Sequence, residues 1–156
     1  MIDELYSARI LKLAANLPHS GRLPAPDGTG ERVARLCGSK AIVDVTLDTE
    51  GRIAAFGQDV KACALGQAAA GVLGEAVIGA SVEEVSAARD AMRAMLKDGG
   101  EGPVGRFDGL RALKQVADYP ARHASTMVAI EATLEAVQQA LGRKTPDTRT
   151  RLAGAA

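Results

Sequence analysis

The spacing of apolar residues changes along the chain. Near the start, apolar residues recur at helical spacing: Tyr6, Ile10, Leu13 and Leu17. We expect a helix there, capped by Asp3 and ended by Pro18. Residues 18–30 are rich in Pro and Gly, which predicts a surface loop with His19 exposed to solvent.

Residues 31–60 follow the two-residue period of β-strands. Strands are expected over 31–37, 40–48 and 52–60, with the sequence Gly38-Ser39 bending the chain after the first. Gly51 ends a turn between the second and third strands, so these two form a hairpin. The pattern predicts a three-stranded antiparallel sheet.

The remainder of the chain favours helices. They are expected over residues 64–77, from 82 to about 96 after a capping box of Ser81 and Glu84, briefly over 110–116, and from Pro120 to 141. The sum is an α+β fold in which helices pack on one face of a three-stranded antiparallel sheet. Residues 1–142 are expected to form one domain, and residues 143–156 a polar, basic, disordered tail.

Charge and composition exclude some functions. Nineteen basic residues balance nineteen acidic ones, aromatic residues make up 3%, and there is no Trp, so nucleic acid binding is not expected. The acidic start and the lack of a long apolar run argue against a signal peptide or membrane span, which predicts a cytoplasmic protein. Cys37 and Cys63 should then stay reduced, without a structural disulfide.

Cys63 stands out because it lies where the third strand ends and a helix of small side chains begins. Free backbone N–H groups and the positive end of the helix dipole favour a thiolate there, and Lys61 adds a cation. The dipole contributes only about 0.3 to 1 kcal/mol, so full ionisation at neutral pH would also need a metal ion.

Three short motifs carry a family resemblance: Leu-Cys-Gly-Ser at residues 36–39, Lys-Ala-Cys-Ala at 61–64, and Tyr-Pro-Ala-Arg-His-Ala-Ser at 119–125. Together with the order of elements, they resemble the iron-sulfur cluster assembly scaffold family of the NifU N-terminal, IscU and SufU type. In that family three cysteines and an aspartate meet at one end of the fold. Cys37 and Cys63 match two of the cysteines, whereas Ser39 takes the aspartate position and Ala124 the third cysteine position.

The resemblance implies a non-enzymatic scaffold that binds iron, zinc or a nascent iron-sulfur cluster through Cys37 and Cys63. His123 matches a family histidine, so Cys37, Cys63 and His123 are the candidate metal ligands, with a fourth position open. The implied partners are a cysteine desulfurase and cluster-acceptor proteins. An alternative to binding on one chain is a cluster shared by the two chains of a homodimer.

Two alternatives remain open. The first is a degenerate family member that acts as a non-metal adaptor for the assembly machinery, because two ligand positions are lost. The second is a thiol enzyme that uses Cys63 as nucleophile and His123 as base. Each of these residues could also be structural, because free cysteines are often buried and a histidine can cap a helix.

Overall fold

Three antiparallel strands form the sheet of the computed structural model, which describes residues 7–144. They are β1 (Gly28–Ala34), β2 (Ser39–Leu47) and β3 (Ile53–Lys61), in the order β1-β2-β3. Thr29 lies opposite Asp44 in the first pair, and Val43 lies opposite Gln58 in the second. The predicted meander is confirmed.

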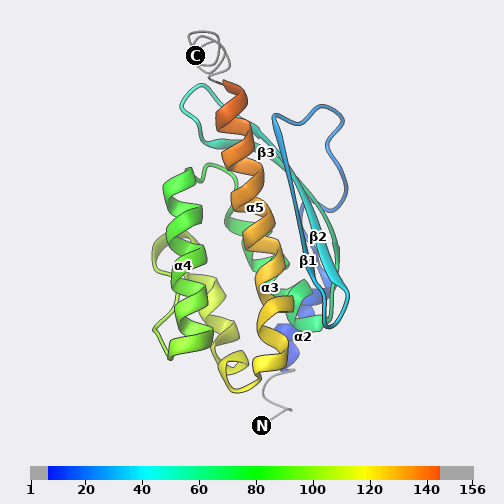
Figure 1. Ribbon diagram of the computed structural model, residues 1–156, viewed down its shortest axis with the longest axis vertical. Helices are drawn as coiled ribbons and strands as arrows, with labels where there is room; N and C mark the ends of the chain where they lie inside the picture. Colours follow the sequence, from blue (N-terminus) through cyan, green and yellow to red (C-terminus); the bar gives the residue numbers. More distant parts are fainter. Residues whose placement is uncertain (1–6, 145–156) are drawn as a thin grey trace, which may run out of the picture.

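Helices pack against one face of this sheet (Figure 1). The α-helices are α2 (Ala8–Ala15), α3 (Ala64–Ala76), α4 (Val82–Asp98) and α5 (His123–Lys144), with 3-10 segments η1 (Gly105–Asp118) and η2 (Pro120–Arg122). Helix α5 lies along β1 and β2, whereas α3 packs between α5 and α2. The apolar face of β2 (Ala41, Val43, Val45 and Leu47) is buried in the core, as its alternation predicts. The α+β prediction is confirmed.

The first strand begins earlier than the sequence predicts. Gly28 and Gly30 belong to β1, although glycine is typical of loops. The reason is close packing: a Cβ atom at Gly28 would collide with the backbone oxygen of Ala136, and one at Gly30 with that of Ala132. Glycine therefore lets α5 lie directly on β1.

The segment between α2 and β1 is attached to the sheet through hydrogen bonds to Asp44 of β2. The carboxylate of Asp44 is fully buried and accepts hydrogen bonds from Arg22, Thr29 and the amide of Leu23. Burial alone would raise the pKa of Asp44, but these donors hold it below its usual value. The predicted loop is therefore anchored to β2, and His19, which it contains, is exposed as expected.

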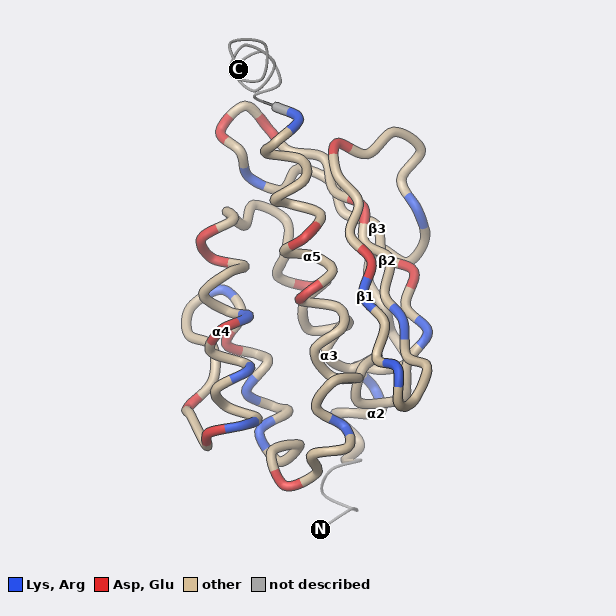
Figure 2. The backbone as a smooth tube through the Cα atoms, in the orientation of Figure 1, with Lys and Arg blue, Asp and Glu red and all other residues tan. Residues whose placement is uncertain are grey.

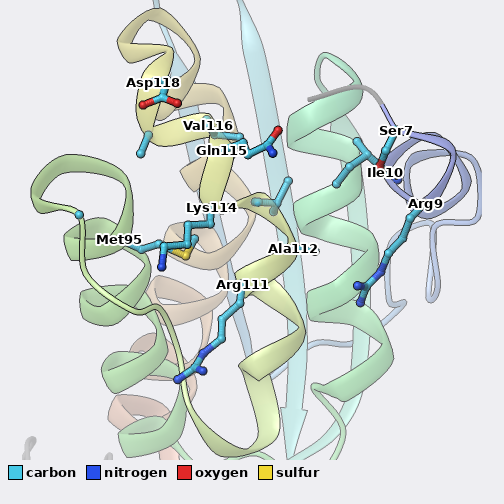
Figure 3. Close-up of a pocket in the computed structure, with 13 residues that line it drawn as sticks. Ser7, Arg9, Ile10, Met95, Arg111, Ala112, Lys114, Gln115, Val116 and Asp118 are labelled. Atoms are coloured by element: carbon cyan, nitrogen blue, oxygen red, sulfur yellow. Dashed lines mark hydrogen bonds between the residues drawn. The ribbon is translucent and has the colours of Figure 1, made fainter. Parts of the chain in front are cut away.

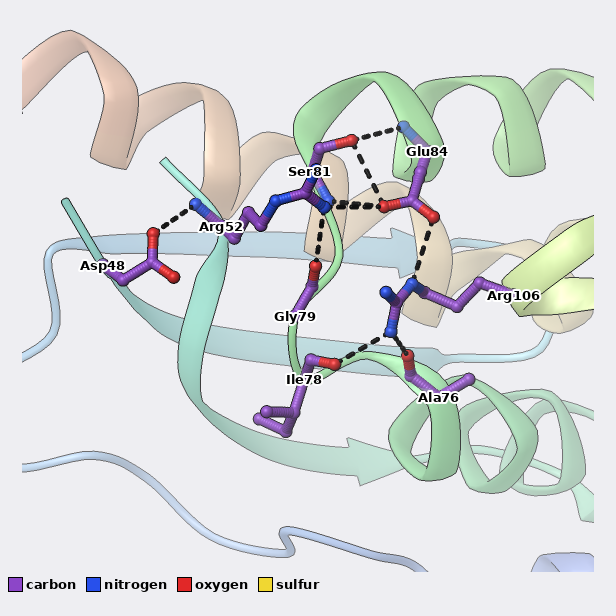
Figure 4. A network of polar contacts seen from close by, with 8 residues as sticks. All are labelled: Asp48, Arg52, Ala76, Ile78, Gly79, Ser81, Glu84 and Arg106. Atoms are coloured by element: carbon purple, nitrogen blue, oxygen red, sulfur yellow. Dashed lines mark hydrogen bonds and ion pairs between the residues drawn. The ribbon is translucent and has the colours of Figure 1, made fainter. Parts of the chain in front are cut away.

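An arginine clamp closes the C-terminal end of α3 (Figure 4). Arg106 Nη1 donates to the carbonyl oxygens of Ala76 and Ile78, at 3.1 and 2.9 Å, and Arg106 Nε donates to Glu84. The same Glu84 accepts from the amide of Ser81 in the predicted capping box, which is confirmed. This clamp satisfies carbonyls that a helix end leaves without partners.

The ends of the chain differ in part from the predictions. Asp3 and Tyr6 lie outside the described residues, and Ser7 caps α2 where the description begins. Helix α5 continues to Lys144, two residues past the predicted domain end, and residues 145–156 of the predicted tail lie outside the description. The short helical turn predicted over 110–116 is part of a 3-10 segment of 14 residues.

Along the described part of the backbone, positions of basic and acidic residues are interspersed (Figure 2). Among the described residues, no helix is both long and apolar enough to cross a membrane.

Candidate functional site

Cys63 lies at the junction of β3 and α3, where it is the N-cap residue of the helix. Its side chain is partly buried. Burial alone would raise the pKa of this thiol, but the Ser125 hydroxyl, the amides of Gly66 and Leu65, and Arg122 together lower it. The lowered pKa has the direction predicted for this helix start, but the cation that contributes to it is Arg122 and not the predicted Lys61.

Cys37 lies in the turn between β1 and β2, and its side chain is exposed. Gly38 follows with φ +76°, a left-handed conformation that glycine adopts without strain, and its amide donates to Ala34. Hydrogen bonds from the hydroxyl and amide of Ser39 lower the pKa of the Cys37 thiol. The predicted bend at Gly38 is confirmed.

Two serine hydroxyls connect the thiols. Cys37 Sγ lies 3.1 Å from Ser39 Oγ, Ser39 Oγ lies 3.0 Å from Ser125 Oγ, and Ser125 Oγ lies 3.1 Å from Cys63 Sγ. The four side chains come from the β1–β2 turn and the start of β2, the start of α3, and the start of α5. Cysteines separated by 26 positions in the sequence thus meet in one polar cluster.

An open hollow of about 610 Å³ lies over this cluster. Cys37, Ser39, Cys63 and Arg122 line it, together with Lys61 at the end of β3. Thiolates bind zinc and iron well, and a hydroxyl offers a harder oxygen donor. The residues in the hollow therefore fit a thiophilic ion that enters from solvent.

The structure does not bring His123 into this hollow. Its Nε2 atom lies 2.9 Å from the carbonyl oxygen of Val116 and 3.3 Å from that of Ala117. Because carbonyls only accept, Nε2 carries the proton in these bonds. His123 and the exposed Ala124 line a different hollow, of about 540 Å³, beside α4.

The three predicted ligands therefore do not form one site. Within residues 7–144, no three Cys, His, Asp or Glu side chains lie close enough together to hold a metal ion. Because Nε2 of His123 donates to carbonyls of η1, this nitrogen is not available as a base for Cys63.

Ser125 is the site residue that the sequence did not identify. It follows the position matched to the family's third cysteine, Ala124, yet its own hydroxyl is the one that reaches Cys63. The signal was present in the last residue of the third motif, but a serine in the first turn of a helix usually indicates capping.

A larger hollow, of about 630 Å³, lies between α2, α4 and η1 (Figure 3). Its charged residues include Arg9, Arg111 and Lys114, but no cysteine or histidine lines it. Arg111 donates to the carbonyl of Pro103, and Lys114 pairs with Glu101. The chemistry of this hollow does not match that of the two thiols, so size alone does not identify the site.

Comparison with known proteins agrees with the fold. The family model for the NifU-like N-terminal domain matches residues 5–126. A crystal structure of the N-terminal part of a nitrogen-fixing NifU-like protein from Brucella abortus is 42% identical, with a TM-score of 0.86, and the match covers 90% of this chain and 96% of that one. A search of curated proteins gave no match.

Two more distant structures share the architecture. A putative iron-sulfur cluster assembly scaffold protein for the SUF system from Fervidobacterium islandicum is 19% identical, with a TM-score of 0.78 over 86% of this chain and 98% of that one. A hypothetical protein is 26% identical, with a TM-score of 0.76 over 87% and 98%. Since the family model spans most of the chain, this protein belongs to the NifU-like N-terminal domain family.

Proposed function

We propose that this protein is a non-enzymatic scaffold in iron-sulfur cluster assembly. It holds iron, zinc or a nascent cluster through Cys37 and Cys63 and passes its cargo to an acceptor. The observation that carries the proposal is that two thiols from separate elements open onto one hollow and are joined through Ser39 and Ser125. Family membership and the scaffold named for the Fervidobacterium structure support it.

Capture begins with the thiolates. The pKa of each thiol is lowered, so the ion displaces fewer protons than it would at ordinary cysteines. Arg122 lies at the same hollow and offsets the negative charge that two thiolates bring together.

The bound ion or cluster can be released because the site is open to solvent. Cys37 is exposed on a turn, so an acceptor thiolate can approach the ion and replace the protein's sulfur ligands in succession. A cysteine desulfurase as sulfur donor and cluster-acceptor proteins are the partners we propose. His123 has no part in this mechanism because its ring binds the carbonyls of η1.

The test is reconstitution without oxygen. Wild-type protein supplied with iron and sulfide should retain both after desalting and show visible absorption. A Cys37→Ala, Cys63→Ala double variant that keeps the wild-type melting temperature should retain neither, and each single variant should retain less than wild type. Identical metal contents in wild type and the double variant would refute the proposal.

A second candidate is the adaptor without metal. It is favoured by the lack of any group of three Cys, His, Asp or Glu ligands in the part of the chain that the structure describes. Pull-down of a cysteine desulfurase separates the two roles. The adaptor predicts undiminished binding by the double cysteine variant together with a wild type that holds no metal.

A further inference from the structure

We infer that the free edge of β1 at Val33, together with the hollow beside α4, is a docking site for an extended peptide of a partner protein that carries apolar and acidic side chains. This hollow is the one of about 540 Å³ that His123 and Ala124 line. The inference goes beyond the proposed function, because the site includes neither thiol and requires no bound ion.

The outer edge of β1 is partly covered by side chains of α5. Because β1 is an edge strand, every second residue directs its backbone N–H away from β2. The amide of Thr29 donates to Gln139 Oε1 at 2.8 Å. The amide of Glu31 donates to Glu135 Oε1 at 3.2 Å. These bonds identify the outward-facing residues of β1, and Val33 is the third of the series.

The cover stops before Val33. Four residues of a helix rise about 6 Å and two residues of a strand about 6.6 Å, so Glu131, one turn before Glu135, lies at the level of Val33. Glu131 pairs instead with Arg93 of α4, at 3.2 Å. Within residues 7–144 the Val33 amide has no hydrogen-bond partner, and the residue is 51% exposed. An unpaired position on an edge strand is a template for another extended chain.

The hollow beside this edge offers a place for side chains of the added strand. Leu96 of α4 and Met127 and Val128 of α5 line it and are nearly buried. Figure 1 shows α5 between α4 and β1. Successive side chains of a strand point to opposite faces of a sheet, so the neighbours of the peptide residue paired with Val33 point toward the helices. An apolar side chain at one of these positions can enter the hollow.

The rim of the hollow favours acidic side chains. Arg32, Arg93 and Lys97 line it, whereas Glu131 is the one acidic residue among its described lining residues. The two arginines pair with Glu135 and Glu131 but stay about half exposed, so their remaining N–H donors are open to another carboxylate. Lys97 is exposed and has no ion pair within the described part of the chain.

Nuclear magnetic resonance of isotope-labelled protein tests the site. The probe is a pool of hexapeptides built from valine, leucine, phenylalanine, aspartate and glutamate, and the matched pool has lysine in place of both acids. The acidic pool should shift the Val33 amide resonance saturably and slow its hydrogen exchange. The amides of Thr29 and Glu31 should change little, because they already donate to α5. The lysine pool should bind about tenfold more weakly or less.

Substitutions locate the binding energy, measured by fluorescence anisotropy with dye-labelled acidic peptides. Val33→Pro removes the amide donor at an edge position where proline is tolerated, and Lys97→Glu reverses a charge on the rim. Each should weaken binding about tenfold. Lys12→Glu makes the same change of charge on an exposed residue of α2 and is the matched control, with wild-type affinity expected. Circular dichroism should confirm that every variant is folded.

Three results would overturn the inference. They are an unmoved Val33 amide at saturating acidic peptide, equal binding of both pools, and equal loss of affinity in Lys12→Glu and Lys97→Glu. A wild-type dimer in analytical ultracentrifugation that Val33→Pro converts to monomer would also overturn it, because a second copy would then cover the edge. If Val33→Pro does not fold, the Val33 amide of the wild type decides.

Failure of this inference is distinguishable from failure of the proposed function. The Cys37→Ala, Cys63→Ala variant should bind the acidic pool with wild-type affinity, and a loss of binding there would contradict a site without the thiols. Absence of metal binding by the wild type would refute the scaffold role and leave the docking site unchanged.

Discussion

The two ends of α3 carry polar clusters of opposite character. At its C-terminal end, the arginine clamp directs Arg106 to two backbone carbonyls and to Glu84, so its charges and helix-end groups find partners within the fold. At its N-terminal end, two thiols and two hydroxyls bond to one another beneath an open hollow. The clamp gives partners to carbonyls at a helix end and so stabilises the fold, whereas the thiols of the other cluster open onto a hollow and are available to a ligand.

Removing both thiols should give the largest effect. The Cys37→Ala, Cys63→Ala variant is expected to lose all specific zinc binding in equilibrium dialysis. Its free energy of unfolding should change by no more than about 1 kcal/mol, because Cys37 is exposed and Cys63 only partly buried. A large loss of stability with zinc binding intact would mean that the thiol cluster stabilises the fold and does not bind the ion.

Removing the arginine clamp should lower the stability of the fold and leave zinc binding unchanged. Arg106→Ala removes the donors of the Ala76 and Ile78 carbonyls and should lower the free energy of unfolding by about 1 to 2 kcal/mol, measured in urea. Zinc affinity should stay at the wild-type value. Arg89→Ala is the control: its ion pair joins it to the exposed Asp90, and its effect should be below about 0.5 kcal/mol.

The serines should control how easily each thiol ionises. In Ser125→Ala, Cys63 loses a hydroxyl donor that lowers its pKa, so the pH midpoint of its alkylation rate should rise. Ser39→Ala should raise the midpoint of Cys37 in the same way. Each rate is measured with the other cysteine replaced by alanine. Unchanged midpoints in both variants would contradict the hydrogen bonds from the two serine hydroxyls to the thiols.

The smallest expected effect is the pH dependence of the clamp. The amide of Ser81 and the Arg106 guanidinium hold the pKa of Glu84 below its usual value despite partial burial. Because the folded pKa is the lower one, the contribution of Glu84 to stability is complete above its unfolded pKa and is lost as the pH falls through the folded value.

Glu84→Gln should therefore cost a few tenths of a kcal/mol at pH 7, since the side chain is 36% exposed and screened by solvent. The difference from wild type should shrink as the pH falls toward and below about 4.3, where the unfolded carboxyl is half protonated. Urea unfolding at several pH values measures it, and a difference that grows on acidification would have the wrong sign.

Local chemistry made much of the fold predictable. The capping box of Ser81 and Glu84, the turn at Gly51 and the helix that begins after Cys63 depend on neighbours within a few residues, and the structure contains all three. The alternation in β2 identified its buried face for the same reason. These features depend on short-range hydrogen bonding and side-chain period.

Tertiary packing decided what the sequence did not predict. The Pro and Gly content of residues 18–30 predicts a loop that includes Gly28 and Gly30, whereas the close approach of α5 explains why glycine stands in β1. The third motif predicts His123 beside the cysteines, but the position of η1 gives its ring two carbonyl partners. The place of Ser125 depends on how α5 meets α3, and local sequence does not reveal a contact between residues 62 positions apart.

X-ray absorption of the zinc-loaded wild-type protein at the zinc edge tests the central claim most directly, because it counts sulfur and oxygen neighbours without altering a residue. We expect one zinc per chain, with two sulfur neighbours at about 2.3 Å. Zinc surrounded only by nitrogen and oxygen, or by four sulfurs drawn from two chains, would contradict a site that Cys37 and Cys63 build within one chain.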